Sequence, residues 1–391
     1  MSLPFREFQA QGYRSLRAIA YPMSQLDVFV GANGVGKTNL YSALELLQAA
    51  AANTLAVDLM RQGGLQSALW AGARRRSEPA RLRLAVGFGE GDGARTRFRY
   101  EIEIGFPPPL EYAATGERIL GSAAFPAEPQ VKQESLILIS AARRTRLVER
   151  AGHAVEARGA DGRMTAIELD LLASETVLGR LDDPSRFPEF DAVRDALLQW
   201  RFYHGIRTDI GSPLRQPCPA VATPTLASDG RDLAAVFATL VHIREDTADL
   251  DAAIDAAFPG AKLEVPLPDR TASFGMRFAE FPKRLFEASE LSDGTLRFLA
   301  LAGALLGYRA PPFIALNEPE ASLHPDLIEP LARLIARAAG RAQIWVVTHS
   351  TRLADAVAAH GVGEIRTVVK RDGATAIEGL KAWGAFAEEE D

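Results

Sequence analysis

The sequence predicts an α/β fold with an antiparallel β region and a second, mostly helical lobe. An apolar strand at residues 26–30 leads through a glycine-rich loop into an alanine-rich helix. Between residues 81 and 148, β-like segments are separated by glycine and proline turns. After residue 311 strands and helices alternate, which is typical of a mostly parallel sheet covered by helices.

The composition is that of a globular protein. The 391 residues are 47% hydrophobic and 24% charged, as in average domains. No stretch approaches the length of a membrane span, and no basic region followed by an apolar run opens the chain. We therefore expect no membrane segment and no secretory signal. The single cysteine, Cys218, excludes an internal disulfide and favours a cytoplasmic protein, and we expect it to be a small buried residue.

The net charge of −6 provides no overall field that would attract nucleic acid. A contact with DNA must then be local. Two arginine clusters are candidates, residues 74–76 and Arg143, Arg144 and Arg146. Solvated surface charge also explains both clusters.

We expect residues 1–150 to form the N-terminal part of one lobe. A strand is predicted over residues 5–13 and another over 26–30, followed by a helix from Lys37 to about Ala52 that no proline interrupts. The predicted antiparallel segments are 81–88, 95–104 and 131–139.

Residues 151–310 form the predicted helical lobe, with amphipathic helices over 190–203 and 233–243 and a proline-rich loop at 212–224. Long heptad repeats are absent from it, so we expect no coiled-coil arm. Residues 311–391 complete the first lobe and end in an acidic, solvated tail at 388–391. The strands and helices predicted there are 313–316, 325–339, 343–347, 351–359 and 365–370.

The segment Gly31-Ala-Asn-Gly-Val-Gly-Lys-Thr38 matches the phosphate-loop pattern G-x-x-x-x-G-K-[ST] and stands between a strand and a helix. Its glycines let backbone N–H groups surround a phosphate at the positive end of the helix dipole. Lys37 is predicted to neutralise the β- and γ-phosphates of ATP, and Thr38 to ligate Mg²⁺. The predicted nucleotide-binding residues of this segment are Asn33, Gly34, Val35, Gly36, Lys37, Thr38 and Asn39.

The C-terminal third carries the second half of the predicted site. An apolar strand ends in Asn317 and Glu318, and we expect Glu318 to be the general base that accepts a proton from the attacking water. A later strand ends in His349, which is placed to bond the γ-phosphate. A structural role for His349 stays open.

Upstream, the segment Glu290-Leu-Ser-Asp-Gly-Thr-Leu-Arg297 leads into a long apolar helix. Ser292 and Gly294 at the start of this helix form a second predicted anion site. Two phosphate-recognising edges on one chain indicate that they serve different active sites. In a two-fold symmetric pair, each ATP would lie between the phosphate loop of one subunit and Ser292 of the other.

These motifs, in this order, resemble the RecF/SMC/OLD branch of ABC-type ATPases. More closely, the chain is similar to the stand-alone predicted ATPases of the AAA_21 group. The resemblance implies a P-loop NTPase fold with an ABC-type head, a homodimer that forms on ATP, and hydrolysis at its interface. It also places Arg14 near the nucleotide, although Arg14 is equally explained as a strand end. The glutamine of the loop between the lobes stays open among Gln66, Gln130 and Gln133.

In one position the chain departs from that group. The residue before the catalytic glutamate is normally acidic and helps to hold Mg²⁺, whereas here it is Asn317. An amide oxygen can still accept a hydrogen bond from a metal-bound water, but one charge is lost. We therefore expect normal ATP binding and slow hydrolysis, unless Glu320 replaces the missing charge.

An ATPase of this kind has three candidate functions. The first is a clamp or switch that acts on DNA in repair, maintenance or anti-phage defence. The second is a regulatory ATPase whose output is a contact with a protein partner, without DNA binding. The third, a subunit of a membrane transporter, is disfavoured by the segment 290–297, called the signature segment below. Because only a short segment follows His349, we expect no Toprim nuclease domain and no DNA cleavage by this chain itself, and a partner nuclease is one expected partner.

Overall fold

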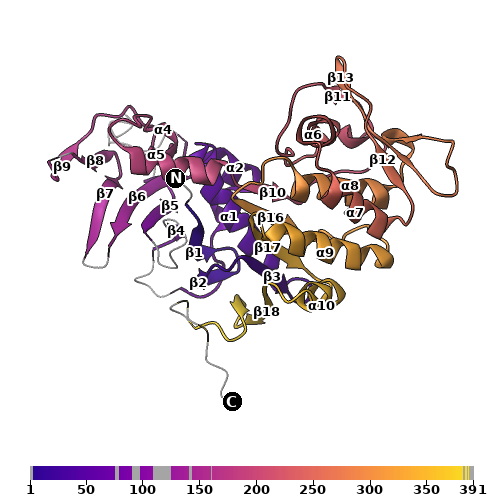
Figure 1. Ribbon diagram of the computed structural model, residues 1–391. Coiled ribbons are helices and arrows are strands. Elements are labelled where there is room, and N and C mark those ends of the chain that lie inside the picture. The colour runs from indigo at the N-terminus through magenta and orange to yellow at the C-terminus, as the bar shows by residue number, and fades with distance from the viewer. Residues whose placement is uncertain are drawn as a thin grey trace. The chain divides into compact units, whose positions relative to one another are not determined.

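The computed structural model describes residues 3–74, 79–89, 97–108, 125–140, 143–159, 161–381, 384 and 386. The chain forms two compact units, each built from separate segments. Unit 1 consists of Met1–Met23, Ala32–Gln199 and Val368–Asp391. Unit 2 consists of Ser24–Gly31 and Trp200–Thr367. Figure 1 labels the elements of both units.

An antiparallel sheet with the strand order β2-β1-β4-β5-β6-β7-β8-β9 dominates the described part of unit 1 (Figure 1). Its strands alternate between buried and partly exposed residues, as expected of a sheet with one face against a core. The strands are β1 (Phe5–Tyr13), β2 (Leu16–Pro22), β4 (Arg81–Phe88), β5 (Phe98–Gly105), β6 (Gln130–Ile139), β7 (Arg144–Ala151), β8 (Ala154–Arg158) and β9 (Met164–Ala166). The predicted antiparallel region is confirmed.

Helix α1 (Lys37–Ala51) is the central helix of unit 1 and contacts β1, β4 and the helices α2, α4 and α5. Alanine and leucine favour this helix, and eleven of its fifteen residues are buried, so both propensity and packing stabilise it. A short strand, β19 (Ala374–Ile377), pairs with the last residues of β18 and contacts β2. The other helices of unit 1 are α2 (Leu55–Arg61), α3 (Gly64–Ala68), α4 (Val177–Arg180) and α5 (Pro188–Leu198).

The sheet of unit 2 is parallel, with the strand order β10-β16-β17-β3-β18. Its central strands are almost continuously buried, as expected of a parallel sheet covered on both faces. The strands are β3 (Leu26–Val30), β10 (Arg201–Tyr203), β16 (Phe313–Asn317), β17 (Gln343–Thr348) and β18 (Glu364–Arg371), of which β18 ends in unit 1.

Helix α8 (Asp293–Leu306) lies at the centre of the apolar core of unit 2 and contacts α6, α7 and α9. The other helices are α6 (Leu233–Thr239), which continues as a π-helical turn (Leu240–Arg244), α7 (Ala248–Ala257), α9 (Ile328–Ala339) and α10 (Thr351–Ala359), with 3₁₀ turns at Pro213–Arg215, Ala288–Glu290 and Pro325–Leu327. The short strands are β11 (Cys218–Pro219), β12 (Lys262–Glu264), β13 (Thr271–Ala272), β14 (Gly275–Arg277) and β15 (Phe286–Glu287). Cys218 is buried, as predicted.

One predicted helix was too long. The helix expected over 190–203 ends at Leu198, and Arg201–Tyr203 instead forms the strand β10 beside β16. The aromatic rings explain this end, because Trp200 packs on Phe313 of β16 with ring centroids 4.8 Å apart. The expectations for residues 75–76, 95–96 and 388–391 fall outside the described residues.

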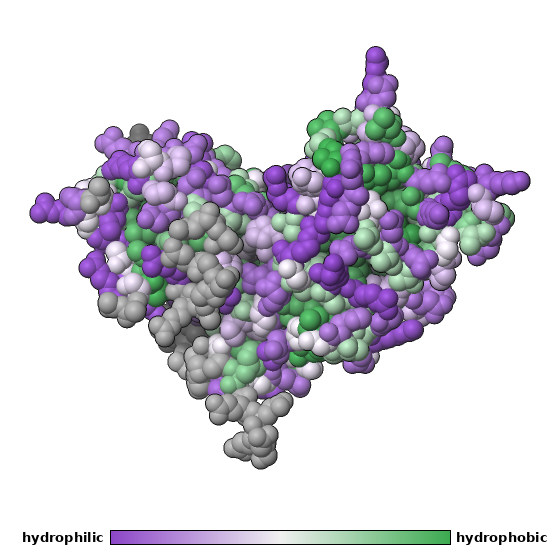
Figure 2. Space-filling view, in the orientation of Figure 1, coloured by the Kyte–Doolittle hydropathy of each residue, from purple (hydrophilic) through white to green (hydrophobic). Residues whose placement is uncertain are grey.

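The surface in Figure 2 is made up mostly of hydrophilic residues on the visible face. Within the described part of the chain, every helix is too short or too polar to cross a membrane.

Candidate nucleotide-binding site

The phosphate loop follows β3, which lies between β17 and β18 in the sheet of unit 2. Gly34 and Gly36 have φ angles of 79° and 97°, in the left-handed region that favours glycine. Gly36 immediately precedes α1, so the loop opens onto a helix N-terminus. The Lys37 ammonium is buried and donates a hydrogen bond to the Ala32 carbonyl at 2.9 Å. Its side chain therefore folds back over the loop that is predicted to hold phosphate.

Within unit 1, side chains distant in sequence hold the loop from behind. The Thr375 hydroxyl in β19 donates to the Val35 carbonyl at 2.7 Å and lies 2.6 Å from the Ser15 hydroxyl. A Cβ atom at Gly36 would lie 2.0 Å from Thr375 Oγ1 and 2.3 Å from Ser15 Oγ. Gly36 is thus required by this close approach as well as by its φ angle.

Arg14 and Asn39, both predicted to bind nucleotide, are in contact. Arg14 Nη1 donates to Asn39 Oδ1 at 3.4 Å, and Asn39 Nδ2 donates to Ser15 Oγ at 2.6 Å. Arg14 Nη2 also donates to Gln62 Oε1 at 3.0 Å, a contact that no sequence pattern predicts. In the same region of α1, burial raises the pKa of the Glu45 carboxyl to about 7. The turn between β1 and β2 is therefore tied to the first turn of α1.

The anchoring of the loop by Thr375 makes a test possible. We expect Thr375→Val to weaken ATP binding by about tenfold, because the Val35 carbonyl loses its donor and one unmet hydrogen bond costs roughly 1–3 kcal/mol. Titration with a fluorescent ATP analogue measures the affinity. Thr375→Ser keeps the hydroxyl and should bind ATP as the unmodified protein does. Equal affinities for the valine and serine variants would show that the Thr375 hydroxyl does not position the loop.

Three strands of the unit 2 sheet end at one edge. In the parallel register, Asn317 of β16 pairs with Val347 of β17, and Thr348 of β17 pairs with Val30 of β3. Glu318, His349 and the first residue of the phosphate loop, Gly31, directly follow these ends. The carboxyl edge of a parallel sheet is where ligands bind in open α/β folds. The structure thus brings Glu318, His349 and the start of the loop to the same edge.

Glu318 has a strained backbone. Its φ of 49° is in the left-handed region, which is costly for a residue other than glycine, and its N–H donates to the Val347 carbonyl at 2.7 Å. Its side chain is 39% exposed, and the Nδ1 atom of His349 lies 3.6 Å from Glu318 Oε1 and 3.5 Å from Glu320 Oε1. His349 therefore faces two carboxylates of its own unit.

Two buried acceptors at this edge, Asn317 Oδ1 and Glu320 Oε2, have no hydrogen-bond partner among the described residues. The other oxygen of Glu320 accepts a hydrogen bond from the Thr348 hydroxyl. Buried polar atoms without a partner are rare and are often satisfied by a water or an ion. An amide oxygen beside a carboxylate fits a hydrated Mg²⁺, which prefers oxygen ligands and retains water.

The signature segment begins α8. Ser292 is exposed and caps the helix, because its Oγ accepts a hydrogen bond from the Thr295 N–H at 3.2 Å. A Cβ atom at Gly294 would lie 3.1 Å from the Ser322 carbonyl, so this glycine allows close packing against the turn after Glu318. The capping and packing roles are structural, and they leave the Ser292 side chain at the surface.

Two arginines that sequence reasoning missed hold this region in place. Arg215 donates to the Ser289 and Leu291 carbonyls at 3.0 and 2.8 Å and pairs with Asp293 at 2.7 Å. Arg297 in α8 donates to the Glu318 carbonyl at 3.5 Å. Burial and the Arg297 charge together lower the pKa of His204. Arg297 is the last residue of the signature segment 290–297, but no sequence pattern predicts which carbonyl it bonds.

Solved structures similar to this chain are head domains of SMC proteins. One is an SMC head bound to the C-winged helix domain of ScpA, with 17% identity, a TM-score of 0.50, and coverage of 96% of this chain and 97% of that chain. Another, from Pyrococcus furiosus, is an Smc head with an extended coiled coil bound to the C-terminal domain of ScpA. It has 16% identity, a TM-score of 0.52, and coverage of 96% of both chains. These likenesses show the fold, which is the predicted P-loop NTPase fold with an ABC-type head.

No curated protein matches the sequence. A family model described as "AAA domain, putative AbiEii toxin, Type IV TA system" matches residues 28–355, a range that contains the phosphate loop, the signature segment, Glu318 and His349. Since this match covers most of the chain, the protein belongs to the AAA_21 family.

Proposed function

We propose that this protein binds and hydrolyses ATP and uses the cycle to switch its association with a second copy of itself. The observation that carries the proposal is the shared sheet edge, where the chain enters the phosphate loop and where β16 and β17 deliver Glu318 and His349. A phosphate loop that begins at this edge and a carboxylate delivered to the same edge are parts that phosphoryl transfer to water requires.

In this proposal Lys37 and the backbone N–H groups of the loop bind the phosphates, and Glu318 accepts the proton of the attacking water. His349 holds the γ-phosphate, and the carboxylates of Glu318 and Glu320 lie beside its ring. Mg²⁺ would be held by the Thr38 hydroxyl with Asn317 on its hydration shell, and it would neutralise charge on the phosphates.

Asn317 supplies no negative charge, so we propose that hydrolysis is slow although ATP binds well. Glu320 is the alternative source of that charge. Supporting the alternative, Glu320 is only 7% exposed and keeps one oxygen without a partner among the described residues.

The proposed switch predicts that ATP and Mg²⁺ shift the protein from monomer to dimer. The reason is that Ser292 is exposed and can therefore contact the ATP bound by a second subunit. Multi-angle light scattering at micromolar protein measures the mass with and without ATP. Glu318→Gln, which cannot hydrolyse its ATP, should give the larger dimer fraction. A monomer in all four samples would contradict the proposal.

Two targets are proposed for the switch: a protein partner, and DNA or a DNA-cutting partner. The acidic net charge favours a protein partner. So does the likeness to SMC heads that were solved with a domain of ScpA bound. DNA or a partner nuclease is the other proposed target, in the setting of repair or anti-phage defence within the cytoplasm. Salt-dependent binding to duplex DNA separates the two, because phosphate contacts weaken steeply as salt rises.

A further inference from the structure

Four arginines of unit 1 converge on one small pocket at the β1–β2 end of the antiparallel sheet. They come from β2, β4 and the segment after α3. The pocket measures about 140 Å³. No acidic residue is among its lining residues, which are Gln11, Gly12, Arg17, Ala18, Trp70, Arg74, Pro79, Arg81 and Arg83. We call it the arginine pocket.

Positive charge is in excess in the arginine pocket. Arg81 and Arg83 share a single carboxylate, Glu103, at 3.2 and 2.5 Å. Among the described residues, Arg74 donates to the Trp70 carbonyl, and Arg17 has no ion-pair partner. Within that part of the chain, four guanidinium groups therefore face one carboxylate.

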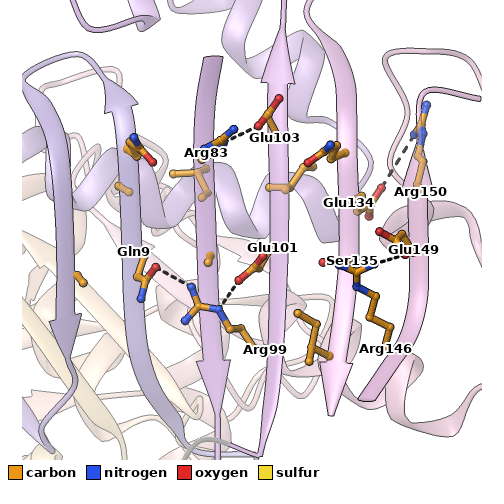
Figure 3. A pocket seen from close by; sticks show the side chains of 18 of the residues that line it. Gln9, Arg83, Arg99, Glu101, Glu103, Glu134, Ser135, Arg146, Glu149 and Arg150 are labelled. Carbon is orange, nitrogen blue, oxygen red and sulfur yellow. Dashed lines mark hydrogen bonds and ion pairs between the residues drawn. The ribbon is translucent and has the colours of Figure 1, made fainter. Parts of the chain in front are cut away.

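In the neighbouring groove on the same sheet, the arginines are paired with carboxylates. This groove of about 570 Å³ shares Gln11, Ala18 and Arg83 with the arginine pocket. Its other arginines each have a carboxylate of their own (Figure 3). The pairs are Arg99 with Glu7 and Glu101, Arg146 with Glu149, and Arg150 with Glu134. The arginine pocket, by contrast, holds four arginines around one described carboxylate.

The surroundings strengthen this local positive potential. Burial and the charge of Arg81 both lower the pKa of Lys132 on β6. The side chain of Glu103 is only 11% exposed, and Trp70, at 8% exposed, forms an apolar wall. Charge-assisted hydrogen bonds from arginine gain strength where solvent is partly excluded, and the planar guanidinium matches phosphate oxygens.

We propose that the arginine pocket is a binding site for a single phosphomonoester group, separate from the phosphate loop and independent of ATP hydrolysis. A dianion balances the excess charge of the four arginines. A run of phosphates is disfavoured, because the adjoining groove presents Glu101, Glu103 and Glu149. The group is carried either by the end of a nucleic acid strand or by a small phosphorylated molecule.

Indole NMR tests the site directly. In protein that carries Lys37→Ala, which removes phosphate binding at the loop, ¹⁵N-labelled tryptophan is observed while inorganic phosphate is added. The Trp70 resonance is identified by its loss in Trp70→Phe. We expect it to move saturably with phosphate, whereas the resonances of Trp200 and Trp345, which are buried in unit 2, stay in place.

Substitutions then test whether the phosphate-induced shift of the Trp70 resonance comes from binding in the arginine pocket. The double variant Arg17→Ala, Arg83→Ala should bind phosphate at least tenfold more weakly, since two charged donors are lost. Arg231→Ala, which removes an arginine that is 69% exposed in unit 2, is the matched control and should leave the titration unchanged. Melting temperatures show that each variant is folded. A Trp70 resonance that does not move, or that moves equally in the double variant, overturns the proposal.

Two oligonucleotides of one sequence distinguish the sources. If a 5′-phosphorylated strand shifts the Trp70 resonance and the 5′-hydroxyl strand does not, the ligand is a strand end. If neither strand acts while inorganic phosphate does, the site takes a small phosphorylated molecule. An equal shift with both strands would mean that internal diesters bind, which contradicts a phosphomonoester site.

Discussion

Glu318→Gln is expected to abolish ATP turnover while ATP binding is kept. Removing a general base typically lowers a rate by about 10²–10⁴-fold. The amide matches the carboxylate in shape. The hydrogen bond from the Glu318 N–H to the Val347 carbonyl, made at a strained φ of 49°, does not involve the side chain and is left intact by the substitution. The affinity for a fluorescent ATP analogue should therefore change little.

Steady-state phosphate release measures the turnover. Glu364→Gln is the matched control, because Glu364 is a half-exposed glutamate at the start of β18 in the same unit. Turnover of Glu318→Gln at the rate of the unmodified protein would assign the role of base to another group, with Glu320 the nearest candidate.

Asn317→Asp is measured in the same assay over a Mg²⁺ titration. It should turn over faster and need less Mg²⁺ if the missing charge limits the rate.

The parts of the site that could be predicted from the sequence consist of residues that are consecutive in the chain. The phosphate loop is one such part, because its chemistry lies in eight adjacent positions between a strand and a helix. The ends of the apolar strands at Asn317 and Thr348 are another, since parallel strands deliver their carboxyl ends to one edge of a sheet. These local patterns were enough for the fold class and for bringing Glu318, His349 and the first residue of the loop, Gly31, to one sheet edge.

The parts that could not be predicted are contacts between distant segments. Thr375 lies far along the chain from Val35, and its segment carries no pattern except that of a short strand. Arg215 stands in a proline-rich loop, where only the folded chain shows that it bonds the Ser289 and Leu291 carbonyls. The end of α5 at Leu198 was missed because aromatic packing of Trp200 on Phe313 outweighed helix propensity. In each case tertiary contacts decide what local preference leaves open.

The second large effect is expected from Ser292→Arg, which should abolish hydrolysis while each subunit still binds ATP. Ser292 is exposed at the start of α8, and in the proposed dimer it completes the partner's site. An arginine there removes a small donor and places a long cation in the proposed interface. It also removes the helix cap, which costs about 0.5–2 kcal/mol, so the melting temperature is measured alongside.

Mixing two inactive variants tests whether Ser292 acts on the partner's ATP. Lys37→Ala should abolish ATP binding, because Lys37 is proposed to bind the phosphates of the ATP held by its own subunit. A mixed dimer of Ser292→Arg and Lys37→Ala contains one site with an intact loop and an intact Ser292. With random pairing and independent sites, about a quarter of the original activity should return. If both residues served the nucleotide of their own subunit, every site in the mixture would carry one defect. A mixture that stays as inactive as its components would therefore refute the exchange of Ser292 between subunits.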